Sequence, residues 1–209
     1  AGPERKSEFF GFVHPLIESA NERVLRERRK LMALDVEDDI GWLERAWLNG
    51  LASDYGIEAQ QMESADVVDT LLLRVDIVPR SLALAQAAKE SGWGTSRFAR
   101  EGNNFFGEWC FDPGCGIVPK NRANDRSHEV RSFSHPEDSI RSYIRNLNTH
   151  ESYKGFRDAR ARMRAAGKEL SGLTLAGQLT RYSERRMAYV EEIRSLIMSN
   201  DLAALDLSE

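Results

Sequence analysis

Apolar residues recur at three- and four-residue steps through most of this chain, which is the pattern of amphipathic helices. The first such stretch covers about 4–34, and His14-Pro15 interrupts it, so we expect a kink or a fresh helix start near Pro15. Asp38 and Asp39 are expected to cap a second helix. Helices are then predicted at about 42–51, 58–73, 81–90, 140–147, 153–166, 174–179 and 189–199. The pattern therefore predicts a mainly α protein.

The helical periodicity fades between residues 103 and 135, where Gly, Asn, Asp and Pro are frequent. The segment 128–133 alternates like a β-strand, so we expect loops with a small hairpin here. Cys110 and Cys115 flank the turn-forming run Phe111-Asp112-Pro113-Gly114. A disulfide-closed loop is geometrically plausible and would imply an oxidising compartment; two reduced thiols are the alternative.

Length and charge limit the classes of function. At 209 residues the chain fits one domain with, at most, a helical appendage, and its net charge of -4 gives no reason to expect capture of nucleic acid. We find no apolar stretch of membrane-spanning length, so an integral membrane protein is not expected. No signal peptide is visible, which neither shows nor excludes secretion.

The most informative chemistry lies at the end of the helix predicted over 81–90. Glu90 ends this helix and is followed by Gly92-Trp93-Gly94. Helical spacing would place Gln86, Glu90 and Trp93 on one face. An indole beside a carboxyl group excludes water, raises the carboxyl pKa and offers a flat surface to a sugar ring, so Glu90 is a candidate acid at neutral pH. The alternative is a solvated helix-terminal Glu beside a core Trp.

Several spaced motifs resemble one family. The segment Ala85–Ser96, AQAAKESGWGTS, resembles the catalytic-helix motif of the bacterial β-N-acetylglucosaminidases of glycoside hydrolase family 73. Asn103-Asn104-Phe105-Phe106-Gly107 is similar to the element that follows it in that family. The resemblance is strongest to the Bax-type proteins of Gram-negative bacteria and covers most of residues 74–200. It includes the runs around Trp109-Cys110-Phe111, Gly114-Cys115-Gly116, Asn146–His150 and Tyr182-Ser183-Glu184.

This resemblance implies a lysozyme-like fold that hydrolyses β-1,4 bonds next to N-acetylglucosamine in peptidoglycan. It implies that Glu90 is the general acid and that a second acid lies in a small β-lobe, where Glu129 is our candidate base and Glu108 its rival. Tyr182 matches a family tyrosine near the cleft, and Tyr189 is a weaker relative of the same segment. Two carboxylates flanking the scissile bond are the usual glycosidase arrangement, while assistance from the acetamido group of the substrate is an open alternative.

The remaining expectations follow from the same interpretation. Residues 1–78 are expected to form a helical region packed on a glucosaminidase domain at 79–209, in a monomer that binds glycan strands in the periplasm or cell envelope without a metal or organic cofactor. The residues expected to shape or position the sugar are Gln86, Trp93, Asn104, Phe105, Glu108, Trp109 and Tyr189.

Rival interpretations come from other classes. A lytic transglycosylase or muramidase would act on the same glycan, and a lysozyme-like domain without turnover would only bind it. Cys110, Cys115, His128 and His135 approach the spacing of a zinc finger, but the histidine pair is one residue too wide and no basic helix surrounds it.

Overall fold

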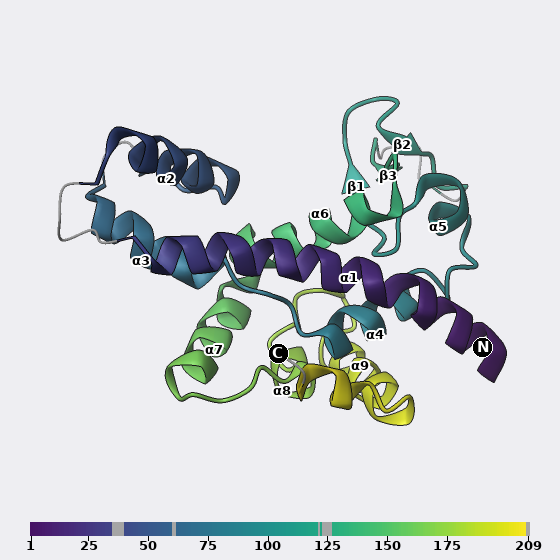
Figure 1. Ribbon diagram of the computed structural model, residues 1–209. Coiled ribbons are helices and arrows are strands. Elements are labelled where there is room, and N and C mark those ends of the chain that lie inside the picture. Colours follow the sequence, from purple (N-terminus) through teal and green to yellow (C-terminus); the bar gives the residue numbers. More distant parts are fainter. Residues whose placement is uncertain (35–39, 60–61, 121, 123–126, 208–209) are drawn as a thin grey trace.

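The computed structural model describes residues 1–34, 40–59, 62–120, 122 and 127–207. The mainly helical class with a small β-lobe is confirmed (Figure 1). The α-helices are α1 (Pro3–Met32), α2 (Trp42–Asp54), α3 (Ser64–Arg74), α4 (Arg80–Glu90), α5 (Arg97–Gly102), α6 (Pro136–Thr149), α7 (Lys154–Ala165), α8 (Gly172–Ala176) and α9 (Met187–Ser199). Two 3-10 helices, η2 (Glu151–Tyr153) and η3 (Leu202–Leu207), follow α6 and α9.

Helix α1 crosses the molecule as one element, with the strands on one side of it and α7, α8 and α9 on the other (Figure 1). It runs through Pro15 without a break, so the expected fresh start is wrong. Proline removes one backbone donor from the helix. The buried residues on both sides of it, among them Val13 and Ile17, belong to one apolar stripe, and burying that stripe keeps the helix continuous.

Helix α4 lies at the centre of the fold. Every residue from Ser81 to Ala88 is buried, and α4 contacts α1, α8, α9 and η3. A helix that is apolar all round is stable only when other elements cover each of its faces. The small alanine side chains let those neighbours approach closely. The neighbouring elements fix the direction of α4 and thereby the position of Glu90 at its end.

Two buried acidic side chains anchor the beginning of α4. Asp206 of η3 accepts hydrogen bonds from the backbone N–H of Ser81 at 3.0 Å, from its hydroxyl at 2.6 Å, and from the N–H of Gly172 at 2.8 Å. Just before α4, Asp76 accepts from the guanidinium of Arg164 at 3.0 Å. Arg160 donates to the carbonyl oxygen of Ile77 at 2.8 Å. Because all of these groups are paired, their burial is tolerated and the position of α4 is well defined.

The β-lobe holds three short strands, β1 (Trp109–Cys110), β2 (Gly116–Ile117) and β3 (Glu129–Arg131). They form an antiparallel sheet in the order β1-β3-β2, so the strand predicted at 128–133 is confirmed and pairs on both of its edges. The pattern missed β1 and β2 because two residues are too few to show alternation. Gly116 permits the pairing, since a Cβ atom there would lie 2.0 Å from the carbonyl oxygen of Val130.

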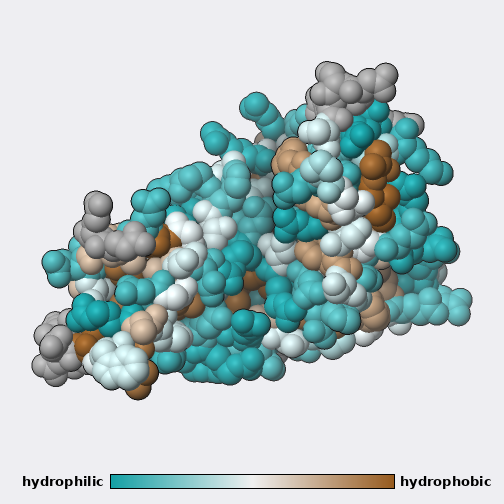
Figure 2. All heavy atoms as spheres, turned by 90° about the horizontal axis from the view of Figure 1, so that it is seen from above, coloured by the Kyte–Doolittle hydropathy of each residue, from teal (hydrophilic) through white to brown (hydrophobic). Residues whose placement is uncertain are grey.

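Other boundaries differ locally from the prediction. Helix α3 begins at Ser64 and not near residue 58, and the short helix α5 was not predicted. Asp38 and Asp39 lie outside the described residues. No helix in the described part of the chain is long and apolar enough to cross a bilayer. Figure 2 shows a mostly hydrophilic surface from above, with hydrophobic residues in scattered positions.

Candidate active site

The backbone turns sharply directly after Glu90, where α4 ends. Gly92, Trp93 and Gly94 all have positive φ values, of 58°, 60° and 74°. For a bulky residue such as Trp this conformation is an outlier that the surroundings must enforce. The turn is held by the N–H of Trp93, which donates to Ala88 at 2.8 Å, and by the hydroxyl of Ser91, which accepts from the N–H of Gly94 at 2.8 Å.

This turn corrects the expected placement of Trp93. The indole lies beyond the helix, so the helical spacing that was to bring it beside Glu90 does not apply. Its ring packs edge-on against Phe9 and Phe10 of α1, with ring centroids 5.8 and 5.4 Å apart. The ammonium group of Lys6 lies 5.2 Å from its centroid. Helix α1 thus supports the strained turn from one side.

Several tyrosine side chains interact with Glu90. The phenol of Tyr189 of α9 lies close enough to the carboxylate of Glu90 to act on its pKa, and the ring of Tyr182 stacks on Tyr189 at 5.4 Å with an interplanar angle of 12°. Tyr153 of η2 lies 6.0 Å from Tyr182, and the charge of Glu90 also reaches Tyr143 of α6. Tyrosines of α6, η2, α9 and the stretch before α9 therefore gather at the end of α4.

Burial raises the pKa of Glu90 above its ordinary value. The hydrogen bond from Tyr189 and the charge of Lys89 oppose this rise, and Glu192 adds to it. Lys89 forms an ion pair with Glu192, so the positive charge of Lys89 is largely neutralised. Glu192 also pairs with Arg185. Desolvation then prevails and favours the protonated acid.

Gln86 lies one helical turn before Glu90 and is completely buried. Its amide nitrogen donates to the phenol oxygen of Tyr189 at 2.8 Å, and its amide oxygen accepts from the hydroxyl of Tyr143 at 2.6 Å. In this geometry Gln86 has no surface to offer a sugar and acts on one only through its neighbours.

Asn104 and Phe105 connect the helical body to the β-lobe. Asn104 is buried, and its amide donates to the carbonyl oxygens of Glu108 at 2.9 Å and Arg131 at 2.8 Å. Phe105 is also buried, with its ring 6.4 Å from that of Phe9. Both residues are therefore buried and shape the site without being exposed on its surface.

Glu108 and Trp109 lie nearer to solvent. The carboxylate of Glu108 accepts from the hydroxyl of Ser142 at 2.8 Å and pairs with Arg131 at 3.1 Å. The indole of Trp109 is 49% exposed and stacks on the imidazole of His128, with centroids 4.1 Å apart. Together Trp109 and His128 form an aromatic surface on the β-lobe that a sugar ring could contact.

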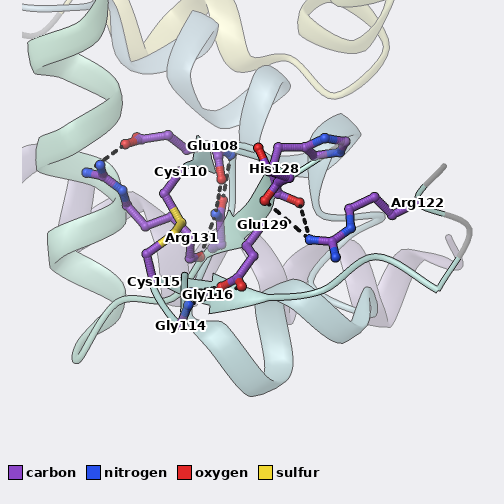
Figure 3. The surroundings of a disulfide bond; sticks show 11 residues. Glu108, Cys110, Gly114, Cys115, Gly116, Arg122, His128, Glu129 and Arg131 are labelled. Atoms are coloured by element: carbon purple, nitrogen blue, oxygen red, sulfur yellow. Dashed lines mark hydrogen bonds and ion pairs between the residues drawn. A yellow bond between two sulfur atoms is a disulfide. The ribbon is translucent and has the colours of Figure 1, made fainter. Parts of the chain in front are cut away.

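Glu129 has a different environment from Glu90. Its carboxylate accepts from the backbone N–H groups of Gly114 at 3.1 Å and Gly116 at 2.8 Å. These two bonds lower its pKa below the ordinary value. Figure 3 shows this carboxylate turned toward the two glycines, while that of Glu108 points away from them toward Arg131.

The predicted disulfide is confirmed. Cys110 and Cys115 are joined, with their Cα atoms 6.2 Å apart (Figure 3). The loop that they close contains Gly114, and Gly116, the second donor to Glu129, directly follows it. The two sulfur atoms and a carboxylate oxygen of Glu129 lie within 4.8 Å of one another. While the S–S bond is present neither sulfur is a thiolate, so these cysteines cannot serve the zinc-finger arrangement.

A hollow of about 650 Å³ adjoins the tyrosine cluster and is lined by Ser152, Thr180, Arg181, Ser183, Glu184, Arg186 and Met187. Arg181 and Ser183, which precede and follow Tyr182 in the sequence, belong to this lining, and the ring of Tyr182 stacks on that of Tyr189. A second hollow, of about 280 Å³, lies between α1 and α6 and includes Arg23, Tyr55 and Arg145. The first lies beside candidate site residues, and its polar lining suits a polyhydroxylated ligand.

Comparison with known proteins identifies the family. Residues 65–202 match the family described as mannosyl-glycoprotein endo-beta-N-acetylglucosaminidase. The chain belongs to this glucosaminidase family. It is also 34% identical over 200 residues to Protein bax of Escherichia coli (strain K12), across 96% of this chain and 71% of that protein. No solved structure matches it. The expected membership of a glycan-hydrolysing family is thereby confirmed.

Tyr143 and Tyr153 were not among the predicted site residues. Both fit the apolar periodicity of predicted helices, which is typical of core residues. Nothing in the neighbouring sequence distinguishes them from other core side chains. A weak signal was present, because a buried phenol needs a hydrogen-bond partner, and Gln86 on the catalytic-motif helix was available as one.

Proposed function

We propose that this glucosaminidase-family protein cleaves the glycan strands of peptidoglycan by hydrolysis of β-1,4 bonds next to N-acetylglucosamine. The observation that carries the proposal is the environment of Glu90, a carboxyl group at a rigid helix end whose pKa burial raises. Membership of the family and the similarity to Protein bax support the substrate class. A protonated Glu90 would donate its proton to the leaving glycosidic oxygen.

The candidate for the second catalytic group, the base, lies in the β-lobe. Glu129 is held in its ionised form by Gly114 and Gly116, which suits a base, but both of its oxygens are engaged by the loop. Each oxygen keeps a second lone pair, which would accept a proton from the attacking water molecule. Glu108 is the alternative carboxylate for this role, and the acetamido group of the substrate is a third candidate.

The other proposed roles follow from position. Tyr182, whose sequence neighbours Arg181 and Ser183 line the 650 Å³ hollow, would hydrogen-bond the acetamido group or the attacking water. Trp109 would stack on a sugar, while Gln86, Trp93, Asn104, Phe105 and Tyr189 would fix the shape of the cleft. A peptidoglycan substrate and the disulfide together favour a periplasmic or cell-envelope location. The division into 1–78 and 79–209 stays a prediction, as does the monomeric state.

Purified peptidoglycan treated with the wild-type protein tests the proposal. Mass spectrometry should show reducing-end sugars that carry one added water and end in N-acetylglucosamine. An anhydro-sugar would instead identify a lytic transglycosylase, and N-acetylmuramic acid at the reducing end a muramidase. Absence of products together with glycan binding would identify a non-catalytic binding domain.

The variant Glu90→Gln assigns the acid. It should lose about 10²- to 10⁴-fold in activity while keeping glycan binding, because the amide keeps the shape but has no proton to transfer. Glu63→Gln is the matched control, since Glu63 is an exposed glutamate at the start of the remote helix α3. Equal activity of Glu90→Gln and wild type would overturn the assignment.

A further inference from the structure

We propose that the groove between α1 and α6 binds the carboxylate groups of the stem peptides that peptidoglycan carries on its glycan strands. The inference rests on the proposed function for the identity of this ligand. The described residues that line the groove do not include Glu90, Glu129 or Tyr182. Binding there is therefore testable without cleavage of any glycosidic bond.

The groove consists of two adjoining hollows, of about 280 and 200 Å³. Ala20 and Arg23 of α1 and Arg141 of α6 line both of them, so the hollows are continuous along the contact between the two helices. On each helix the lining residues recur at three- and four-residue steps, which places them on one face. Such residues are Ala20, Arg23 and Glu27 on α1, and Arg141, Arg145 and Asn148 on α6.

The groove lies between two raised parts of the molecule. Tyr55, directly after α2, belongs to its lining, as does Ser142 of α6. The hydroxyl of Ser142 donates to the carboxylate of Glu108, directly before β1, at 2.8 Å. Figure 1 shows α2 and the β-lobe on the same side of α1 and α6, and Figure 2 looks onto this side. A glycan strand on Glu108 and Trp109 would therefore have its peptide branches next to the groove.

Positive charge prevails in this groove, although the whole chain has a net charge of -4. The charged residues among its described lining are the arginines Arg23, Arg26, Arg141 and Arg145 and the glutamates Glu27 and Glu137. Arg26 also pairs with Glu22, outside the lining, at 3.9 Å. Guanidinium groups bind carboxylates through paired N–H donors, so this excess of arginine favours a ligand that carries carboxylates.

The central arginines have partners that use only part of their hydrogen-bonding capacity. Arg23 lies 3.6 Å from Glu27 through its Nε atom, and Arg141 pairs with Asp138. Both arginine side chains are exposed, and ion pairs of exposed side chains contribute little to stability. A guanidinium has five N–H donors, more than one carboxylate engages. Arg23 and Arg141 are therefore the groups that we expect to bind the ligand.

The end of the groove near α2 is ordered before any ligand binds. Arg145 donates to the backbone carbonyl oxygen of Asp54, and its guanidinium lies 4.4 Å from the ring centroid of Tyr55. The buried phenol of Tyr55 donates to the carboxylate of Glu27 at 2.8 Å. Groups that already have fixed positions lose less conformational entropy when a ligand binds.

Small apolar side chains complete the lining. Ala20 and Val24 of α1 and Ile144 of α6 are buried at the bottom of the larger hollow. A stem peptide combines alanine methyl groups with free carboxylates, and this groove combines an apolar bottom with guanidinium groups beside it. A bare sugar ring would match it less well, because no tryptophan or phenylalanine is among the described residues of the lining.

A nitrogen-15 NMR titration of the full chain with the free stem peptide, released from purified peptidoglycan, tests the inference. The amide shifts should change mainly in residues 16–27 and 137–148, and the affinity should fall as salt is added. Arg23→Gln and Arg141→Gln should each weaken binding about tenfold. Arg29→Gln removes the same charge from an exposed position of α1 outside the groove, so it is the matched control and should bind like wild type.

A second probe is the same peptide with its carboxylates converted to amides, which should bind at least about tenfold more weakly. The inference is overturned if wild type does not bind the free peptide, if the amidated peptide binds equally well, or if the folded Arg23 and Arg141 variants bind like wild type. Inorganic phosphate bound as tightly as the peptide would identify a general anion site and would also overturn it.

The outcome is distinguishable from that of the proposed function. Peptide binding in a protein that releases no products from peptidoglycan would support the groove and refute the hydrolase. Hydrolysis by a protein that does not bind the free peptide would do the reverse. The spectra of the variants also report whether each of them is folded, so a loss of binding is not confused with a loss of structure.

Discussion

The end of α4 and the β-lobe each hold a glutamate, and the pKa values of the two carboxyl groups are shifted in opposite directions. Glu90 is surrounded by tyrosine rings, and burial raises its pKa. Glu129 receives two backbone N–H groups from a loop closed by a disulfide, and these lower its pKa. One environment favours a proton that can be given away, and the other favours a permanent charge.

The difference shows that partners, and not burial alone, decide what a carboxyl group does. Backbone donors held at fixed positions compensate a carboxylate fully, whereas a single phenol does not offset desolvation. The helical body therefore supplies a candidate acid, and the lobe supplies a carboxylate held in its charged form. The following predictions test this contrast, from the largest expected effect to the smallest.

The first prediction compares activity losses. Glu90→Gln should cost about 10²- to 10⁴-fold, and Glu129→Gln should cost far less, about tenfold, because its oxygens are already bonded to the loop. Hydrolysis of peptidoglycan by both purified variants measures this. Equal losses would show that Glu129 leaves its loop and takes part in the reaction, and the same comparison with Glu108→Gln would identify the rival.

The second prediction concerns the closure of the lobe. Cys110→Ser together with Cys115→Ser should lower the free energy of unfolding by about 2 kcal/mol, because the short loop gains freedom in the unfolded chain. Guanidinium unfolding measures the change. The N–H groups of Gly114 and Gly116 should also exchange faster with solvent. If their exchange is unaltered, Glu129 alone is sufficient to hold the loop.

The third prediction is an opposite pH dependence of the two glutamates. The raised pKa of Glu90 means that its contribution to stability is present below the ordinary value of 4.5 and lost as the pH rises through the folded value. Glu90→Gln should therefore be more stable than wild type at neutral pH. The lowered pKa of Glu129 stabilises the protein above 4.5 and is lost as the pH falls through the folded value.

Thermal unfolding of wild type, Glu90→Gln and Glu129→Gln between pH 3 and pH 8 measures both signs. The advantage of Glu90→Gln should grow as the pH rises, and the disadvantage of Glu129→Gln should vanish in acid. Glu191→Gln, at an exposed position of α9, serves as the control without either trend. If the unfolding temperatures of Glu90→Gln and Glu129→Gln depend on pH in the same way as wild type, the two glutamates do not differ as proposed.

The fourth and smallest effect is expected on the surface of the lobe. Trp109→Ala should raise KM severalfold with kcat nearly unchanged, since a stacking contact is worth about 1 kcal/mol and lies away from the proton transfer. Trp93→Ala should instead lower stability, because its indole supports the turn between α1 and α4. If Trp109→Ala reduces kcat as strongly as it raises KM, the lobe takes part in chemistry.

Local patterns determined much of this protein. The spacing of apolar residues predicted most helices, the alternation at 128–133 predicted the central strand, and the Pro-Gly turn between Cys110 and Cys115 predicted the disulfide. Several spaced motifs, from the one around Glu90 to Tyr182-Ser183-Glu184, predicted the family, and the family match confirms it. These features are encoded within a few neighbouring residues, so the chain reveals them without its fold.

Only the tertiary structure decided the surroundings of the two glutamates. The positive φ at Trp93 takes the indole out of the helical spacing of α4, and its ring packs on α1. Tyrosines far from Glu90 in the sequence interact with its carboxyl group. The donors on Glu129 come from a loop that precedes it by more than a dozen residues. A pKa depends on desolvation and on partners close in space, and a linear pattern contains neither until the chain has folded.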